Sequence, residues 1–380
     1  MRIEQTQWIH GTGWRPHPPG RLRNAPQVVL VFGSAPMLRD AAPMGMLRRA
    51  YPSATMFGCS TAGEIRDTTV SDDSIVASAI HFEHTRVCTA QLDISAPERS
   101  FEVGERLAQA LDAEGLRHAF VLSDGLRVNG SELVKGLTQG LPESVTVTGG
   151  LAGDGTRFEQ TLVLLGDDPR PGTVGILGLY GQRLSVGYGS LGGWDPFGPE
   201  RLITRASGNV LFELDGRSAL SLYKEYLGEH AAGLPSTGLL FPISLRMGTG
   251  ELPLVRTILG INEANQTMTF AGDMPVGAFA RLMKANFDRL VDGASGAART
   301  SGRALQGSRP ELALLISCVG RRLVLKQRVE EEVEAVREVL GPGPTLAGFY
   351  SYGEISPFTP NARCELHNQT MTTTILSEAA

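Results

Sequence analysis

The stretch Gly348-Phe349-Tyr350-Ser351-Tyr352-Gly353-Glu354-Ile355 lies near the carboxyl end of the chain and follows an apolar strand candidate. The same skeleton, Gly, four residues and then Gly-Glu-Ile, occurs upstream as Gly58-Cys59-Ser60-Thr61-Ala62-Gly63-Glu64-Ile65. A looser copy ends in Gly149-Gly150-Leu151-Ala152-Gly153-Asp154. Glycines at a strand end permit backbone geometry that a β-carbon would forbid. We therefore expect three turns of one kind.

A strand–helix–strand pattern precedes each of these glycine turns. The first strands are predicted at Gln27–Gly33, Ala119–Ser123 and Leu312–Cys318, and the helices at Met37–Ala50, Gly130–Gly140 and Leu323–Leu340. Each helix is followed by a proline, which indicates the end of the helix and precedes the next strand: Pro52, Pro142 and Pro344. We interpret the pattern as a diverged internal duplication, with three ordinary βαβ units as the alternative. The duplication predicts that the glycine turns lie close together, at the carboxyl ends of their strands.

The remaining segments are less regular. Two strands are predicted at 74–82 and 86–94, and helices at 101–113 and 277–291. A Gly/Ala/Ser run at 293–304 is suited to close packing on a sheet. Residues 1–25 are rich in proline and glycine, so we expect a strap without regular structure that packs Trp8 and Trp14 on the domain, or alternatively a flap over a pocket. Residues 192–199 form a turn-dense break.

Strands that alternate with helices and meanders predict an α/β (α+β) layered sandwich with mixed sheets and two related domains. We place an N-terminal extension at 1–25, a first domain at 26–226 and a second at 227–380, with the break at 192–199 as an alternative boundary. No G-x-G-x-x-G follows the first strand and no Walker A loop occurs, which argues against a Rossmann or P-loop domain.

Composition excludes several classes of protein. The 380 residues are 42% hydrophobic and 20% charged, as in ordinary globular proteins, and the net charge of -5 offers no footprint for nucleic acid. No apolar run of transmembrane length and no signal peptide are evident, so we expect a cytoplasmic protein. The four cysteines form no Cys-x-x-Cys, which argues for free thiols over structural zinc.

The three glycine turns and the later motif His367-Asn368-Gln369-Thr370 together resemble the FIST sensory proteins, in which an N-terminal and a C-terminal FIST domain stand in tandem. The resemblance runs from about residue 26 to the end. It implies a ligand-binding input module of signal transduction. Some bacterial stand-alone members are haem proteins that sense nitric oxide and modulate a partner histidine kinase, and other members are thought to sense small molecules such as amino acids.

The resemblance therefore leaves three functions open. The first is a haem-based sensor of nitric oxide, part of a two-component system, that acts on a partner histidine kinase or cyclase. The second is a haem-free sensor of an amino-acid-like molecule, and the third is a non-catalytic interaction scaffold.

Under the haem hypothesis, haem b would be held non-covalently, because no Cys-x-x-Cys-His occurs. His367 is the best candidate for the metal ligand, since imidazole is the commonest axial ligand and this residue opens the final motif. Cys364 is an alternative through its thiolate, and Tyr350 or Tyr352 a weaker one. The plain structural alternative for His367 is a strand-end histidine hydrogen-bonded to a turn carbonyl.

A polar ligand would instead meet neutral donors and acceptors at Ser60, Thr61, Asn368 and Gln369. Cys59 lies in the same turn as Ser60 and Thr61. For Glu64, Asp154 and Glu354 the expectation is stabilisation of the turns through side-chain to backbone hydrogen bonds, with ligand contact as the alternative.

Catalytic motifs are absent from the sequence. Ser60 does not lie in G-x-S-x-G, and Cys59, His367 and Asn368 form a Cys-His-Asn trio only if the fold brings them together. We expect no turnover.

Overall fold

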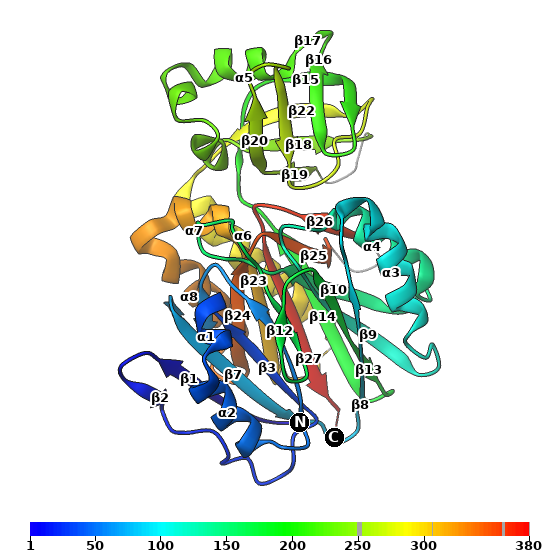
Figure 1. The fold of residues 1–380 in the computed structure, drawn as a ribbon, viewed down its shortest axis with the longest axis vertical. Coiled ribbons are helices and arrows are strands. Elements are labelled where there is room, and N and C mark those ends of the chain that lie inside the picture. Colours follow the sequence, from blue (N-terminus) through cyan, green and yellow to red (C-terminus); the bar gives the residue numbers. More distant parts are fainter. Residues whose placement is uncertain (249–252, 306, 359–361, 380) are drawn as a thin grey trace.

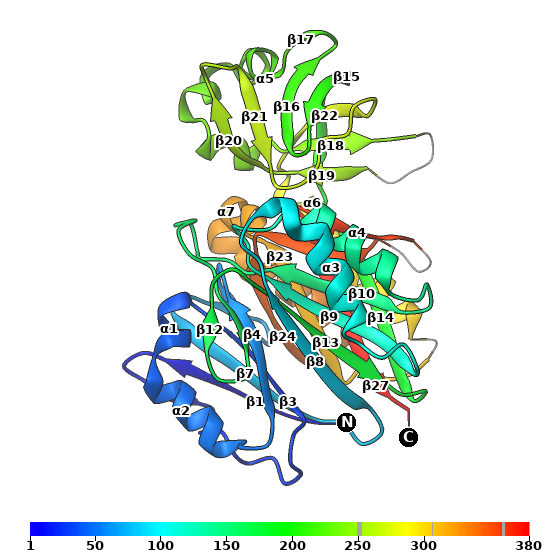
Figure 2. The same ribbon diagram turned by 45° about the vertical axis from the view of Figure 1, so that its right-hand side comes forward.

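The computed structural model describes residues 1–248, 253–305, 307–358 and 362–379. Figures 1 and 2 show a core of three sheets and a separate lobe, with both termini at the end of the core away from the lobe. The core sheets are mixed, because each holds one parallel pair of strands among antiparallel neighbours. The prediction of an α/β layered fold with mixed sheets is confirmed.

The first sheet is seven-stranded, in the order β12 (Pro169–Arg170), β11 (Val163–Leu165), β4 (Thr55–Ser60), β3 (Val28–Gly33), β7 (Ser74–His81), β1 (Arg2–Ile9), β2 (Gly13–Arg15). The second runs β26 (Cys364–His367), β25 (Gly353–Pro357), β10 (Thr146–Leu151), β9 (Leu116–Ser123), β13 (Thr173–Tyr180), β8 (Arg86–Asp93). The third runs β14 (Leu184–Leu191), β27 (Met371–Glu378), β23 (Leu312–Cys318), β24 (Thr345–Ser351), β5 (Glu64–Arg66), β6 (Thr69–Ser71).

The lobe holds an antiparallel sheet in the order β19 (Leu254–Arg256), β18 (Ile243–Arg246), β22 (Phe279–Lys284), β15 (Asp195–Ser207), β16 (Val210–Leu214), β21 (Thr267–Phe270), β20 (Ile258–Asn262), with β17 (Arg217–Ser218) on β16. The helices are α1 (Ala35–Arg39), α2 (Ala41–Ala50), α3 (Ser100–Gln109), α4 (Gly130–Gly140), α5 (Ala219–Leu227), α6 (Phe287–Ala304), α7 (Val319–Leu325) and α8 (Val329–Leu340). Short 3-10 turns are η1 (Pro97–Arg99), η2 (Gly228–Gly233), η3 (Ser236–Leu240) and η4 (Lys326–Arg328).

The three predicted strand–helix–strand units all form, and they exchange strands with one another. Two of the predicted helices are divided, however: α1 and α2 replace the helix at Met37–Ala50, and α7, η4 and α8 replace the helix at Leu323–Leu340. The parallel pairs β3/β4, β9/β10 and β23/β24 are each flanked by an antiparallel strand, respectively β7, β13 and β27. The strand that follows each glycine turn pairs with another unit: β5 with β24, β11 with β4, and β25 with β10. This cyclic exchange joins the units into one core.

The exchange brings the three glycine turns together, as the duplication predicts. Ser60 of the first turn accepts a hydrogen bond from the amide of Gly153 of the second at 2.8 Å, and the Ala62 amide donates to the Tyr350 carbonyl of the third at 2.8 Å. The Tyr352 amide closes the ring by donating to the Leu151 carbonyl at 3.2 Å.

The first glycine of each turn is required by a close approach of two strands. A β-carbon on Gly58, Gly149 or Gly348 would lie 1.8, 1.9 and 1.8 Å, respectively, from the carbonyl oxygen of the residue paired with it on the neighbouring parallel strand. The inner faces of the three sheets also meet there, with Phe32 tilted against Phe349 at 4.8 Å between ring centroids.

Residues 1–25 differ from the strap that the sequence favours. β1 pairs with β7 along its whole length, so the segment extends the first sheet. Trp8 and Trp14 do pack on the domain, edge to face at 5.6 Å, where they contact the apolar cluster beneath α2. The proline-rich part begins only after β2, which explains why composition underestimated the strand.

The helix predicted at 277–291 is wrong. Residues 279–284 form β22, in which Ala280 and Leu282 alternate into the lobe core. Asn286 caps the helix that follows by accepting from the Arg289 amide, so α6 begins ten residues later than predicted. The small-residue run lies within α6 and packs against β14, where Gly187 approaches the Ser301 carbonyl too closely for a β-carbon.

The lobe is an insertion between β14 and α6. The predicted break at 192–199 contains the start of β15 at Asp195, and the chain returns to the core after Lys284. The sheets thus separate at residues 195 and 284, while the division into sequence domains at residue 226 stays a prediction. Within the described residues no helix is long and apolar enough to cross a membrane.

Candidate functional site

A cleft of about 570 Å³ opens where the three units meet at the carboxyl ends of their parallel strands. This edge of a sheet is where ligands bind in many α/β proteins. We call it the turn cleft. It is lined by Ser34 after β3, residues 61–64 of the first glycine turn, Asp72 and Asp73 before β7, residues 155–157 after the second turn, and Val319, Arg322, Leu323, Lys326 and Val329 of the third unit.

Arg322 ties the third unit to the first across the turn cleft. Its guanidinium donates to the Ala62 carbonyl at 2.6 Å and to both carboxylate oxygens of Asp72 at 2.6 and 2.7 Å. This bidentate pair lowers the pKa of Asp72 below its ordinary value, chiefly through the hydrogen bonds from Arg322. Both groups are therefore charged at neutral pH and already paired with each other.

Lys326 is the cation of the turn cleft that remains available. It is exposed, has a positive φ of 51°, and forms no ion pair with any residue that the structure describes. By contrast, Arg157 is held by Asp154 through an Nε–Oδ1 hydrogen bond of 3.0 Å. A ligand carboxylate can therefore pair with Lys326 without displacing a protein partner.

Ser34 is a cleft residue that sequence reasoning missed. Its side chain is 5% exposed, and its buried hydroxyl has no hydrogen-bond partner among the described residues. Buried polar groups are nearly always paired in folded proteins, so this hydroxyl beside a cleft is a candidate for contact with a ligand or a water molecule. The available signal was its place directly after the first strand, at the same sheet edge as the glycine turns.

Glu64 lines the turn cleft and is almost fully buried. Its Oε1 accepts from the Thr61 hydroxyl at 2.5 Å, and its Oε2 accepts from the Ser74 amide and hydroxyl at 3.2 and 2.7 Å. Burial raises the pKa of Glu64 to about 7, although these hydrogen bonds oppose the shift. The carboxyl thus stabilises the turn and also lines the turn cleft.

Glu354 repeats this arrangement in the third unit. Ser351 donates to its Oε1 at 2.6 Å, and the amide and hydroxyl of Thr370 donate to its Oε2 at 3.2 and 3.0 Å. Burial raises the pKa of Glu354 to about 8. Each Gly-Glu-Ile acid therefore anchors its turn to the start of the strand that flanks the unit. Glu354 lies in the core and does not line the turn cleft.

These raised pKa values predict a pH-dependent stability. The folded protein holds the carboxyl protons of Glu64 and Glu354 more tightly than the unfolded chain does, so this stabilisation is full below the ordinary pKa of 4.5 and is lost as pH rises through about 7 and about 8. We expect the wild type to lose stability relative to Glu354→Gln by about 1.4 kcal/mol per pH unit between roughly pH 5 and 8. Urea unfolding across this range measures the difference.

Glu334→Gln is the control, because Glu334 is exposed on α8. A pH profile of Glu354→Gln parallel to that of the wild type would show that this buried carboxyl does not titrate as described.

His367 lies in a different environment. It is 1% exposed, its Nε2 donates to the Ser356 carbonyl at 2.6 Å, and Phe358 packs edge-on at 4.2 Å between ring centroids. Burial lowers the pKa of His367 to about 4, so the ring is neutral. The hydrogen bond to a main-chain carbonyl is the contact that the plain structural interpretation expects.

The other haem candidates, Cys364, Tyr350 and Tyr352, each contact different residues from those that contact His367. The Cys364 thiol donates to the Val147 carbonyl at 3.3 Å, and burial raises its pKa, which disfavours a thiolate. The Tyr350 hydroxyl donates to Glu332 at 2.6 Å, and Tyr352 stacks on Phe158 at 4.4 Å. The described residues hold no group of three His, Cys, Asp or Glu side chains that suits a metal ion. This arrangement does not favour haem, because Nε2 of His367, the Cys364 thiol and the Tyr350 hydroxyl are already hydrogen-bonded, although Nδ1 of His367 has no partner among the described residues.

Asn368 and Gln369 contact the lobe. The Thr257 amide of the lobe donates to the Asn368 side-chain oxygen at 3.4 Å, and the Gln369 side chain donates to the Leu239 carbonyl at 3.3 Å. The Gln369 carbonyl accepts from the Trp194 indole at 2.8 Å. The motif that opens with His367 therefore forms part of the contact surface between the core and the lobe.

Of the candidates in the first glycine turn, Thr61 and Glu64 line the turn cleft and the others do not. Cys59 is fully buried in β4, where burial raises the pKa of its thiol. The Ser60 hydroxyl donates to the Gly153 carbonyl at 2.7 Å and accepts from the Leu162 amide at 2.8 Å, which joins two units. Cys59 and His367 belong to different sheets, so the structure does not support the Cys-His-Asn trio.

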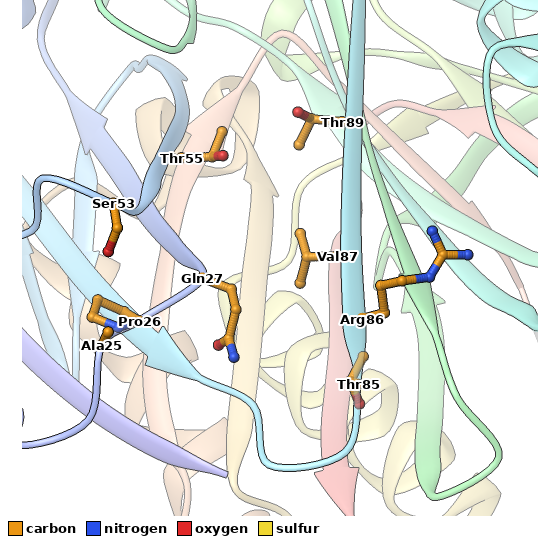
Figure 3. Close-up of a pocket in the computed structure, with 9 residues that line it drawn as sticks. All are labelled: Ala25, Pro26, Gln27, Ser53, Thr55, Thr85, Arg86, Val87 and Thr89. Carbon is orange, nitrogen blue, oxygen red and sulfur yellow. The ribbon is translucent and has the colours of Figure 1, made fainter.

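A second groove, of about 520 Å³, lies near the amino ends of β3 and β4, beside β8 (Figure 3). Figure 3 shows Gln27, Thr55 and Thr89 around it. Its amide, Gln27, is already bound to the backbone of Phe82, and its cation, Arg86, stacks 3.9 Å from the Tyr180 ring. It therefore offers a ligand fewer unpaired polar groups than the turn cleft.

Comparison with known proteins agrees with a module of signal input. The FIST N domain matches residues 27–217 and the FIST C domain matches residues 219–357. The chain therefore belongs to the FIST family, whose domains are sensory, bind small ligands and act in signal transduction.

Two similar proteins come from mycobacteria. An uncharacterized protein of Mycobacterium tuberculosis strain H37Rv is 29% identical over 243 residues, and one of Mycobacterium bovis is 30% identical over 243 residues. The matched region spans 59% and 60% of the length of these relatives, and the same shares of this chain.

Two solved structures of cyanuric acid hydrolase also align with the chain. The enzyme from A. caulinodans covers 94% of this chain and 91% of its own at 7% identity and a TM-score of 0.31. The other covers 100% and 99% at 8% identity and a TM-score of 0.34. Likeness at this level bears on neither fold nor function.

Proposed function

We propose that this protein is a haem-free sensor that binds a small polar molecule with both an acidic and a basic group, such as an amino acid, in the turn cleft. The observation that carries the proposal is the pair of unpartnered groups there: the buried Ser34 hydroxyl and the Lys326 ammonium. Glu64 lines the same cleft.

The charges of the turn cleft set the ligand chemistry. A carboxylate pairs with Lys326 at the mouth, where charge-assisted hydrogen bonds are stronger than neutral ones. An amine finds acceptors at Glu64 and Asp73, which also line the turn cleft. Thr61 and Ser34 supply hydroxyls that fix orientation. The nearest arrangement to a nucleophile with a base is the Thr61 hydroxyl, which donates to Glu64 at 2.5 Å. Because Glu64 is 1% exposed and holds that hydroxyl within the turn, we propose binding without turnover. We further propose that the bound state is passed to a separate histidine kinase or cyclase.

The proposal predicts a ligand-dependent melting temperature. Each protein amino acid is added singly to the purified chain, and at least one should raise the melting temperature by mass action. Lys326→Gln should weaken the binding of that amino acid by up to about fivefold, since an ion pair of an exposed side chain contributes roughly 0–1 kcal/mol. Ser34→Ala should weaken it to a smaller extent. Isothermal titration calorimetry measures both.

Lys284→Gln is the matched control, because it removes an exposed lysine from the lobe. Equal loss of affinity in both lysine variants would contradict the turn cleft as the site. If no amino acid changes the melting temperature, the scaffold becomes the better hypothesis.

The haem alternative is tested on the same preparations. After reconstitution with haem, we expect no stoichiometric Soret band. A Soret band that is lost in His367→Ala and kept in His81→Ala would instead support haem ligation through His367 and reject the haem-free proposal.

A further inference from the structure

We infer that the lobe is the moving output element of this sensor, and that α7 couples its position to the turn cleft. The inference rests on the proposed function for the identity of the site and adds how occupancy is transmitted. Two connections join the lobe to the core: residues 192–194 lead out of β14, and residues 285–290, which are a two-residue loop and the first turn of α6, lead back into the core. Figures 1 and 2 show α7 at the end of the core next to the lobe.

One arginine of α7 holds both connections. The Arg321 guanidinium is fully buried and donates to the carbonyl of Gly192 on the outgoing connection. It also donates to the carbonyl of Leu290 on the returning connection at 2.7 Å and to Glu332 at 2.7 and 3.0 Å. Loss of these partners would leave a buried charge unpaired, which strongly destabilises a protein. If α7 shifts, the two connections must follow it.

The next residue faces the turn cleft. Arg322 binds the Ala62 carbonyl and Asp72 on the wall of the turn cleft, and Val319 and Leu323 of the same helix line it. α7 therefore has the ligand site on one side and the lobe connections on the other.

The side of α7 away from the turn cleft packs on the junction with the lobe. Val324 and Leu325 form an apolar cluster with Trp194, Met283 and Leu290. The Gln369 side chain, which bonds the lobe, lies so near that a β-carbon on Gly320 would be 2.3 Å from it. Any ligand that binds differently to two positions of α7 shifts the lobe between two positions, which is the physical requirement for coupling.

The fluorescence of Trp194 can be used to detect changes at the junction between α7 and the lobe, because Trp194 packs in that junction. The chain has three tryptophans, and Trp8→Phe with Trp14→Phe leaves only Trp194. In this background, Arg322→Gln should red-shift the Trp194 emission and raise its acrylamide quenching constant about twofold, because loss of the wall contact loosens α7. Arg337→Gln is the matched control: like Arg322 it is 21% exposed and joins the third unit to an aspartate of the first, but from α8.

Asp72→Asn provides a second test from the loop side, where the carboxylate is 63% exposed and folding should tolerate the change. It should move Trp194 in the same direction as Arg322→Gln, while Asp67→Asn, the partner of Arg337, should not. If Trp194 is unchanged in both test variants, or changes as much in the controls, the coupling is rejected.

The protein amino acids, added singly to the same background, separate the two proposals. An amino acid that raises the melting temperature and leaves Trp194 unchanged would overturn the coupling and keep the turn cleft as a site. A Trp194 response to Arg322→Gln without binding of any amino acid would keep the coupling and overturn the proposed ligand class.

Discussion

Arg321→Met should destabilise the protein by about 3–5 kcal/mol, because it leaves the Glu332 carboxylate buried without its cation. Both side chains are fully buried, and Glu332 also accepts hydrogen bonds from Ser317 at 2.9 Å and Tyr350 at 2.6 Å. The arginine additionally satisfies the carbonyls of the two lobe connections. Urea unfolding measures the change in the free energy of unfolding.

Arg328→Met is the matched control, since Arg328 forms ion pairs with Asp288 and Glu331 but is 42% exposed. Exposed pairs contribute roughly 0–1 kcal/mol, so its effect should be small. Replacement of both buried partners, Arg321→Met with Glu332→Leu, should recover part of the loss. Equal urea midpoints for Arg321→Met and Arg328→Met would contradict the role of the buried pair.

Gly58→Ala should also have a large effect, of roughly 3 kcal/mol or more, or should abolish soluble expression. Its β-carbon would stand 1.8 Å from a main-chain oxygen of β3, so two parallel strands must separate at the point where the three units meet. Gly348→Ala should have a similar effect, since a β-carbon on Gly348 would also lie 1.8 Å from a main-chain oxygen, in the third unit. The free energy of unfolding and the soluble fraction measure the effect.

Gly302→Ala controls for the substitution itself. Gly302 lies in α6, and a β-carbon there would meet no atom within 4 Å. Alanine favours helix over glycine by up to about 1 kcal/mol, so this variant should be as stable as the wild type or more so. If Gly58→Ala is as stable as Gly302→Ala, the close approach of the strands is not a requirement of the fold.

The sequence predicts the repeating units well because their signals are local. Glycines at strand ends, prolines before strands and the bounds of Gly130–Gly140 depend on neighbouring residues alone, and α4 forms with those bounds. The helix predicted at 277–291 failed because a short apolar run does not separate strand from helix, and pairing with β15 and β18 decided it.

The candidate site could be predicted only in part, for a similar reason. Thr61 and Glu64 lie in a recognisable turn, and the structure places both in the turn cleft. Ser34 and Lys326 come from different units that meet through the exchange of strands, so no spacing in the sequence joins them. Asn368 and Gln369 contact the lobe and do not line the turn cleft, and residue types alone do not distinguish a polar motif that contacts a lobe from one that binds a ligand.

The most direct test of the turn cleft as a sensor site is hydrogen–deuterium exchange with and without the amino acid that gives the largest rise in melting temperature. Exchange reports local opening at each amide, so it locates the ligand without a structure of the complex. We expect slower exchange in residues 61–64, 155–157 and 322–326, and loss of that protection in Lys326→Gln. Protection confined to residues around His367, with none in the turn cleft, would contradict this account.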